Sequence, residues 1–207
     1  MEKNFKLTSE FIVNRFGVKL FRIECVKEFK SIKIGEKGGY VEKEENIFGD
    51  AWISGNARIS GDARIAGNAR ISGNAEISGD ARISGNARIW GNARIWGNAE
   101  IMGNAEISGN ARISGDVEIS GNARIWGDAE IMGNAVSTKK VFTLNFVYKL
   151  TLTDKHIKFG CIQKTIKEWV SFLDSKEIIE TKRDTDKFKL IEMSLRLAIE
   201  QHKQLDQ

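Results

Sequence analysis

Residues 53–76 read ISGNAR ISGDAR IAGNAR ISGNAE, which are four copies of one six-residue unit. The unit Ile-x-Gly-(Asn or Asp)-Ala-x occurs fifteen times without interruption over residues 47–136. Its first position is always Ile, its third is always Gly, and its fifth is Ala except at Val117. Self-similarity at a fixed period predicts a repeat architecture, in which each structural unit stacks on its neighbours.

The order of residue types within the unit predicts how it folds. The stretch Ala-x-Ile-x alternates apolar and variable positions, which is the period-two pattern of a short strand with one buried face. Gly followed by Asn or Asp interrupts each strand, and these residue types tolerate the positive φ angles that a corner can require. Short strands joined by such corners predict a solenoid whose coils are connected by parallel ladders.

The pattern resembles the hexapeptide-repeat family of left-handed β-helices, in which an aliphatic residue is followed four positions later by a small one. The resemblance implies three hexads per 18-residue coil, so the fifteen hexads make five coils. We therefore predict a mainly β protein, a left-handed parallel β-helix with an N-terminal β cap and a C-terminal α+β module. These three parts correspond to residues 1–46, 47–136 and 137–207.

The segments beside the repeat are expected to cap the strand edges that a solenoid exposes at its ends. Residues 18–26 are predicted to form a strand, and residues 35–39 a turn that leads into the first coil. Beyond the repeat, residues 141–152 and 156–162 have strand-like composition and flank a predicted turn at 153–155.

Helices are predicted in the C-terminal segment from their N-terminal signals. Thr165 and Glu168 form a capping-box pattern, and Asp174 and Glu177 repeat it. A longer helix is predicted to begin at Asp184, with apolar residues spaced to form one buried stripe. That stripe comprises Phe188, Ile191, Leu195 and Ala198.

Residues 18 positions apart are expected to stack on one face of the rod. We call the face of Trp52 and Arg70 the first face, that of Arg58 the second, and that of Arg64 the third. Cross-coil ion pairs are expected within Arg58–Glu76–Arg94 and Arg88–Glu106–Arg124. Exposed pairs of this kind contribute only about 0–1 kcal/mol each, so they set register more than stability.

Large apolar side chains at outward positions indicate an interface. The candidate interaction surface comprises Trp52, Trp90, Trp96, Met102, Trp126, Met132, Arg70, Arg88 and Arg124. A second explanation stays open, because residues 93–106 and 123–136 are nearly identical. Duplication of whole hexads would then place Trp and Met on the surface without selection for a binding site.

The repeat offers no obvious catalytic group. Acyltransferases of the family that it resembles typically use a His on the rod, and related carbonic anhydrases hold zinc with three His. Here the two histidines are His156 and His202, both beyond the repeat. We therefore predict no catalytic, cofactor-binding or metal-binding residues, and no cofactor.

Aspartate replaces asparagine at some corners, and three of these residues are expected on one edge of the rod. They are Asp62, Asp80 and Asp116. A bound Ca²⁺ is one interpretation, but two adjacent carboxylates supply too few of the six to eight oxygens that calcium prefers. The favoured interpretation is that each Asp is a solvated substitute for Asn at a corner.

Charge and hydropathy exclude several classes of protein. The chain carries a net charge of +4, but the repeat holds eight Arg against ten acidic residues, a net charge of −2. This slightly acidic surface counts against nucleic-acid binding along the rod. No apolar run is long enough to span a membrane, and the N-terminus lacks a secretory signal. We therefore expect a cytoplasmic protein in which Cys25 and Cys161 are free thiols.

Both ends carry a second resemblance. The segments at 20–23 (LFRI), 38–41 (GGYV) and 160–161 (GC), the last followed by TIKEW at 165–169, are similar to a phage and prophage group of hexapeptide-repeat proteins. Such proteins are often labelled acyltransferases on fold alone. The resemblance implies a phage or mobile-element setting, and a phage-encoded protein of this kind would work in the cytoplasm of a host bacterium.

The function expected from these features is that of a non-enzymatic phage-type scaffold that binds another protein of the phage or the host. A narrower hypothesis is inhibition of a host defence system. The alternative is an acyltransferase-like enzyme with an atypical active site. Because hexapeptide relatives usually form trimers of parallel rods, we also expect a homo-oligomer, with a trimer joined through the first face favoured.

Overall fold

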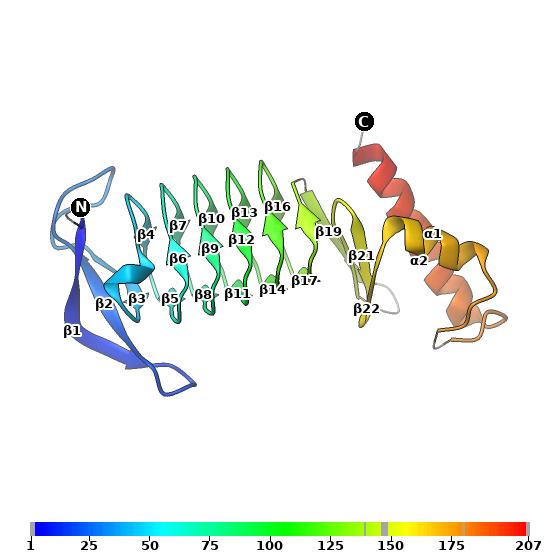
Figure 1. The fold of residues 1–207 in the computed structure, drawn as a ribbon, viewed down its shortest axis with the longest axis horizontal. Helices are drawn as coiled ribbons and strands as arrows, with labels where there is room; N and C mark the ends of the chain where they lie inside the picture. The colour runs from blue at the N-terminus through cyan, green and yellow to red at the C-terminus, as the bar shows by residue number, and fades with distance from the viewer. Residues whose placement is uncertain (1–2, 139, 146–148, 180, 206–207) are drawn as a thin grey trace.

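The computed structural model describes residues 3–138, 140–145, 149–179 and 181–205 (Figure 1). A rod of short strands occupies the middle of the molecule, with a β-meander at its N-terminal end and a sheet with two helices at its C-terminal end. The prediction of a mainly β fold with a parallel solenoid of about five coils is confirmed. The left-handed sense of the coil stays a prediction.

The solenoid strands are two to four residues long and follow one another at hexad spacing. They are β4 (Trp52–Ile53), β5 (Arg58–Ile59), β6 (Arg64–Ile65), β7 (Arg70–Ile71), β8 (Glu76–Ile77), β9 (Arg82–Ile83), β10 (Arg88–Ile89), β11 (Arg94–Trp96), β12 (Glu100–Ile101), β13 (Glu106–Ile107), β14 (Arg112–Gly115), β15 (Glu118–Ile119), β16 (Arg124–Ile125), β17 (Glu130–Gly133) and β18 (Val136–Ser137).

Three parallel sheets form the three faces, as expected from the 18-residue spacing. The first face contains β4, β7, β10, β13 and β16, the second β5, β8, β11, β14 and β17, and the third β6, β9, β12, β15 and β18. Ile89 is in register with Ile71 on one side and Ile107 on the other. The parallel ladder therefore places the inward Ile residues directly above one another.

The interior of the rod is a column of stacked apolar side chains. Every Ile at the first hexad position and every Ala at the fifth is at most 2% exposed, and Val117 is also buried. This core extends without a break from Phe5 in the N-terminal cap to Val141 beyond the last hexad. The N-terminal cap and the rod therefore share one hydrophobic core.

The corners differ in one respect from expectation. Every corner Gly from Gly49 to Gly133 has a positive φ between 63° and 88°, but none of the Asn or Asp residues that follow them does. The Asn side chains instead form ladders, in which each amide donates to the next coil. One ladder runs Asn56, Asn74, Asn92, Asn110 and Asp128, with N···O distances of 2.9–3.4 Å.

The N-terminal cap is an antiparallel meander of β1 (Phe5–Val13), β2 (Lys19–Cys25) and β3 (Lys37–Val41). Strand β3 pairs in parallel with β5, so the meander extends the second-face sheet. The predicted turn at 35–39 is wrong for Gly38 and Gly39, which lie within β3. A Cβ on Gly38 would lie 2.5 Å from the Ile53 carbonyl oxygen, so these glycines permit close packing of β3 on the first coil.

At the other end, β19 (Lys140–Asn145) pairs in parallel with β16 and then begins an antiparallel meander. The following strands are β20 (Lys149–Leu152), β21 (His156–Phe159) and β22 (Ile162–Thr165). They extend the first-face sheet, and the predicted turn between β20 and β21 is confirmed.

Two helices pack on this sheet and form a second hydrophobic core with it. Helix α1 (Ile166–Asp174) begins at the predicted capping box of Thr165 and Glu168. The repeated signature at Asp174 starts no helix, because α1 ends there and Ser175 is its C-cap. Helix α2 (Asp186–Leu205) carries the predicted stripe, and all four of its residues are buried.

Candidate interaction surfaces

The exposed aromatic and Met side chains do not form one patch. Trp90, Trp96, Met102 and Trp126 are 37–44% exposed. Trp90 and Trp126 follow β10 and β16 on the first face, two coils apart, whereas Trp96 belongs to the second face and Met102 follows β12 on the third. The structure therefore distributes these residues around the rod.

Two predicted surface residues are covered. Trp52 is only 5% exposed, because the N-terminal loop places Phe29 against it with ring centroids 5.8 Å apart. Met132 is half-buried beside Ser114 on the second face. The assignment of Trp52 to an exposed surface was wrong, since the sequence did not show that the cap folds over the first coil.

The arginines of the first face form a like-charged pair. Arg70 and Arg88 are in direct register, and neither forms an ion pair within the part of the chain that the structure describes. Glu106 pairs with Arg124 at 3.5 Å and not with Arg88, so the expected triad forms only in part. On the second face the expected triad is complete, because Glu76 pairs with Arg58 at 3.2 Å and Arg94 at 3.6 Å.

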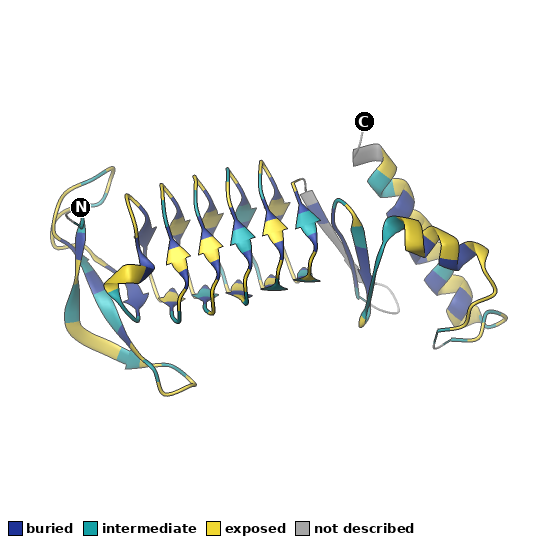
Figure 2. Ribbon diagram, viewed as in Figure 1, coloured by how far each residue is buried: buried dark blue, intermediate teal, exposed yellow. Residues whose placement is uncertain are grey.

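The third face has a simpler order of charges. Its outward residues are Arg64, Arg82, Glu100 and Glu118, one on each successive coil. Arg82 and Glu100 form an ion pair at 2.8 Å. Figure 2 shows this face toward the viewer, with exposed residues on β6 and β9.

The edge that carries Asp62, Asp80 and Asp116 is partly neutralised within the chain. The ammonium of Lys43 lies 2.6 Å from Asp62, and this hydrogen bond lowers the pKa of the Asp62 carboxyl. Asn98 donates to Asp116 at 2.8 Å. Among the described residues, no group of three or more His, Cys, Asp or Glu side chains could hold a metal ion.

The two histidines lie in the C-terminal module. Burial lowers the pKa of His156, and its Nδ1 atom has no hydrogen-bond partner within the described residues. His202 contacts the backbone oxygen of Asp154. Neither histidine therefore lies on the coils. The hexapeptide acyltransferases, in contrast, typically carry their catalytic His on the rod.

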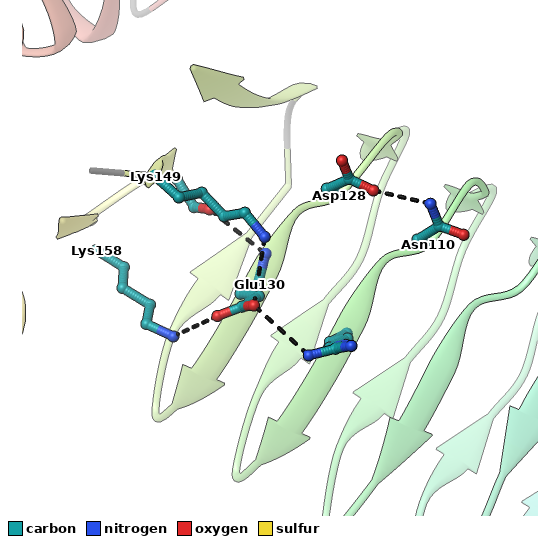
Figure 3. A network of polar contacts seen from close by, with 7 residues as sticks. Asn110, Asp128, Glu130, Lys149 and Lys158 are labelled. Atoms are coloured by element: carbon teal, nitrogen blue, oxygen red, sulfur yellow. Dashed lines mark hydrogen bonds and ion pairs between the residues drawn. The ribbon is translucent and has the colours of Figure 1, made fainter. Parts of the chain in front are cut away.

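One carboxylate adds side-chain contacts to the β16–β19 ladder at the junction of the rod with the C-terminal module. Glu130 on β17 accepts from Lys158 at 2.9 Å and from Lys149 at 3.4 Å, and lies 3.9 Å from Arg112 (Figure 3). The Lys158 side chain is only 9% exposed. Hydrogen bonding from Lys158 and the charges of both lysines lower the pKa of Glu130.

The solenoid is similar to one known protein family. Residues 46–144 match the bactofilin family, which is described as polymer-forming and cytoskeletal. The match covers just under half of the chain and ends within β19, the strand that continues the first-face ladder beyond the last hexad. A comparison with curated proteins finds no match.

This match corrects two expectations. The resemblance to phage-type hexapeptide proteins labelled acyltransferases was wrong as a family assignment, because the six-residue period specifies a coil geometry that both families share. The hypothesis of a phage-encoded inhibitor of host defence is overturned with it, and the acyltransferase alternative also has no support. Among the described helices, none is long and apolar enough to cross a membrane.

Replacing Glu130 by Gln is expected to destabilise the C-terminal module. The ammonium of Lys158 would then be buried without a counter-charge, and breaking a buried pair costs about 3–5 kcal/mol. We expect the lower end of this range, because the Glu130 side chain is 25% exposed. Chemical denaturation followed by circular dichroism at 222 nm, where the two helices of the module contribute, would measure the loss, and an unchanged midpoint would contradict it. Arg124→Gln is the control, because it breaks an ion pair in which the arginine side chain is 57% exposed.

The lowered pKa of Glu130 predicts that the stability of the fold depends on pH. Since its pKa is lowered in the folded chain, the pairing stabilises the fold above the pKa of the unfolded state. That stabilisation is lost as the pH falls below about 4 and through the lowered pKa. The wild type should therefore lose stability in this range more steeply than Glu130→Gln, as measured by thermal melts across pH.

The aspartate edge is expected to be independent of metal. EDTA should leave the melting temperature unchanged, because Lys43 and Asn98 already pair with two of the carboxylates. Asp80→Asn should be neutral or stabilising by up to about 1 kcal/mol, since an amide there can donate to Asn98 as the other ladders do. A fall of several degrees on chelation would instead indicate a bound cation.

Proposed function

We propose that this chain is a non-catalytic scaffold protein that assembles with copies of itself into a cytoskeletal polymer. The observation that carries the proposal is the match of residues 46–144, the whole solenoid, to a family described as polymer-forming. A cytoplasmic location, expected from the sequence, belongs to the same proposal.

The physical properties of the rod support a structural role. Five coils stacked at about 4.8 Å each make a rod of about 24 Å, with one continuous apolar core and ladders of hydrogen bonds along its length. Such a unit is rigid and presents flat faces with a regular spacing. These are suitable properties for a building block that has to meet identical copies in a fixed geometry.

The structure no longer favours the first face as the surface through which copies of the chain associate. The hexapeptide relatives led us to expect a trimer of parallel rods joined through the first face. Trp52 was expected to contribute to the apolar surface of that face. With Trp52 buried and Arg70 beside Arg88, that face offers less apolar area and a column of like charges. Self-association remains part of the proposal, and the first face is no longer its favoured seam.

Electron microscopy and sedimentation velocity of the purified full chain test the proposal. We expect extended assemblies whose size increases with protein concentration. A single species with the mass of one chain, at all concentrations and salt conditions, would contradict it. Circular dichroism of the same sample would verify that the β-structure is intact.

A further inference from the structure

Within the described residues, the third face is the one face whose sheet receives no strand from either cap. The second-face sheet continues into β3, β2 and β1, and the first-face sheet continues into β19 to β22. The third-face sheet, as far as the chain is described, contains only the solenoid strands β6, β9, β12, β15 and β18. In Figure 2 no cap strand lies in front of β9 and β12.

The charges on this face change sign once along the rod. Arg64 and Arg82 are adjacent on the N-terminal half, and Glu100 and Glu118 are adjacent on the C-terminal half. Only the central two, Arg82 and Glu100, pair with each other. In the described part of the chain, neither Arg64 nor Glu118 forms an ion pair within 4.0 Å, although the charge of Arg64 helps to lower the pKa of the neighbouring Asp62 carboxyl. Both ends of the row can therefore accept a charged partner.

The third faces of two copies are complementary in charge when their rods are antiparallel. A two-fold axis that crosses the rod between β9 and β12 would place Arg64 opposite Glu118 of the second copy. The same axis would place Arg82 opposite Glu100 of the second copy. Parallel rods related by a two-fold axis would instead place each charge opposite its like. Charge complementarity across an interface favours the matching orientation and suppresses the others.

The other two faces fit this arrangement less well. Turned end over end, the second face would match Arg58 with Glu130 and Glu76 with Arg112, but its central Arg94 would lie opposite Arg94 of the second copy. On the first face, Lys30 lies beside Arg70 and Arg88, and the row then reads Glu106 and Arg124, which is not complementary in either orientation. On the second face, the β1–β2 turn lies beside the coils near Glu76, and the lysines of the C-terminal module already neutralise Glu130.

Apolar surface accompanies the charges. A shallow groove along the third face is lined by Phe48, Ala66 and Met102, and Phe48 and Met102 are 44% and 40% exposed. In the antiparallel arrangement Met102 would lie opposite Ser84 of the second copy, near the two-fold axis. Sheets that pack face to face are about 10 Å apart, which leaves room for these side chains.

We propose that two copies of this chain pair through their third faces with the rods antiparallel. This inference rests on the proposed function, since it specifies one lateral contact by which the scaffold associates. The pair is held in register by four Arg–Glu contacts across the two-fold axis, and Met102 supplies apolar contact at its centre.

Charge reversal tests the pairing with the full-length protein. Arg82→Glu and Glu100→Arg each place like charges opposite one another at both central positions. A one-to-one mixture of the two variants restores opposite charges at all four positions. Arg88→Glu is the matched control, because it reverses an exposed arginine one hexad away on the first face. Circular dichroism and melting temperature verify that each variant is folded.

Sedimentation velocity at low salt is expected to show paired rods for the wild type and for Arg88→Glu. Each third-face variant alone should lose the pair, and their mixture should regain it. The pairing is overturned if Arg82→Glu associates like the wild type, if the mixture fails to regain the pair, or if the wild type forms a trimer.

Electron microscopy of the same samples separates the pairing from the proposed function. Wild-type polymers that Arg82→Glu leaves unchanged would overturn the pairing and leave the scaffold function intact. Paired rods that never form longer assemblies would support the pairing and contradict the polymer. A wild-type chain that remains a monomer would contradict both.

Discussion

Ile89→Asp is expected to unfold the central coils of the solenoid. The Ile89 side chain is fully buried and stacks between Ile71 and Ile107. A carboxylate there would be surrounded by Ile and Ala side chains with no hydrogen-bond donor. The cost of burying such an unpaired group places the loss above about 4 kcal/mol. Urea denaturation followed by circular dichroism would measure it.

The outward neighbour provides the control for this experiment. Arg88 precedes Ile89 on β10 and is exposed, so Arg88→Asp should change the free energy of unfolding by less than about 1 kcal/mol. A soluble Ile89→Asp protein with wild-type circular dichroism and melting temperature would refute the inward orientation of the first hexad position.

Gly109→Ala is expected to be much more destabilising than Gly127→Ala, although both glycines have nearly the same φ. Their φ angles are 75° and 71°, so an alanine at either position pays the cost of left-handed backbone, about 1–2 kcal/mol. A Cβ on Gly109 would also lie 2.7 Å from the backbone N and O of Gly127. Among the residues that the structure describes, a Cβ on Gly127 would have no neighbour within 4 Å.

The difference between the two variants therefore isolates the close stacking of coils. To accept a Cβ at residue 109, the coils must separate and strain the 2.8 Å hydrogen bond from Asn110 N to Gly127 O. Overpacking of this kind costs about 1–3 kcal/mol, which we expect as the difference between the variants. Equal losses in thermal or chemical denaturation would show that φ alone explains the glycines.

The rod was predictable because its signal is both local and repeated. Each hexad specifies a strand and a corner by itself, and the uninterrupted period allows only one stacking register. The caps lack such redundancy. Strand β1 has a weak alternation of buried and exposed residues, and Gly38 and Gly39 resemble a turn until their contact with the first coil is known.

The surface was predicted less well than the core for a related reason. Exposure of an outward residue depends on what else folds against it, and no periodic pattern specifies that. Trp52 precedes an inward Ile and Trp90 follows one, so both are outward positions of the first face. Phe29 nevertheless covers Trp52, whereas Trp90 is exposed. The pairing of Glu106 with Arg124 in place of Arg88 likewise depends on side-chain geometry.

The sequence by itself determined the coil, its buried Ile and Ala columns, the glycine corners and the order of charges on each face, because all of these follow from position within a fixed period. Only the tertiary structure decided which faces receive the caps, that Glu130 joins the rod to the C-terminal module, and that the third-face sheet is left without an added strand. These features depend on contacts between segments far apart in the chain, and a local pattern carries no information about such contacts.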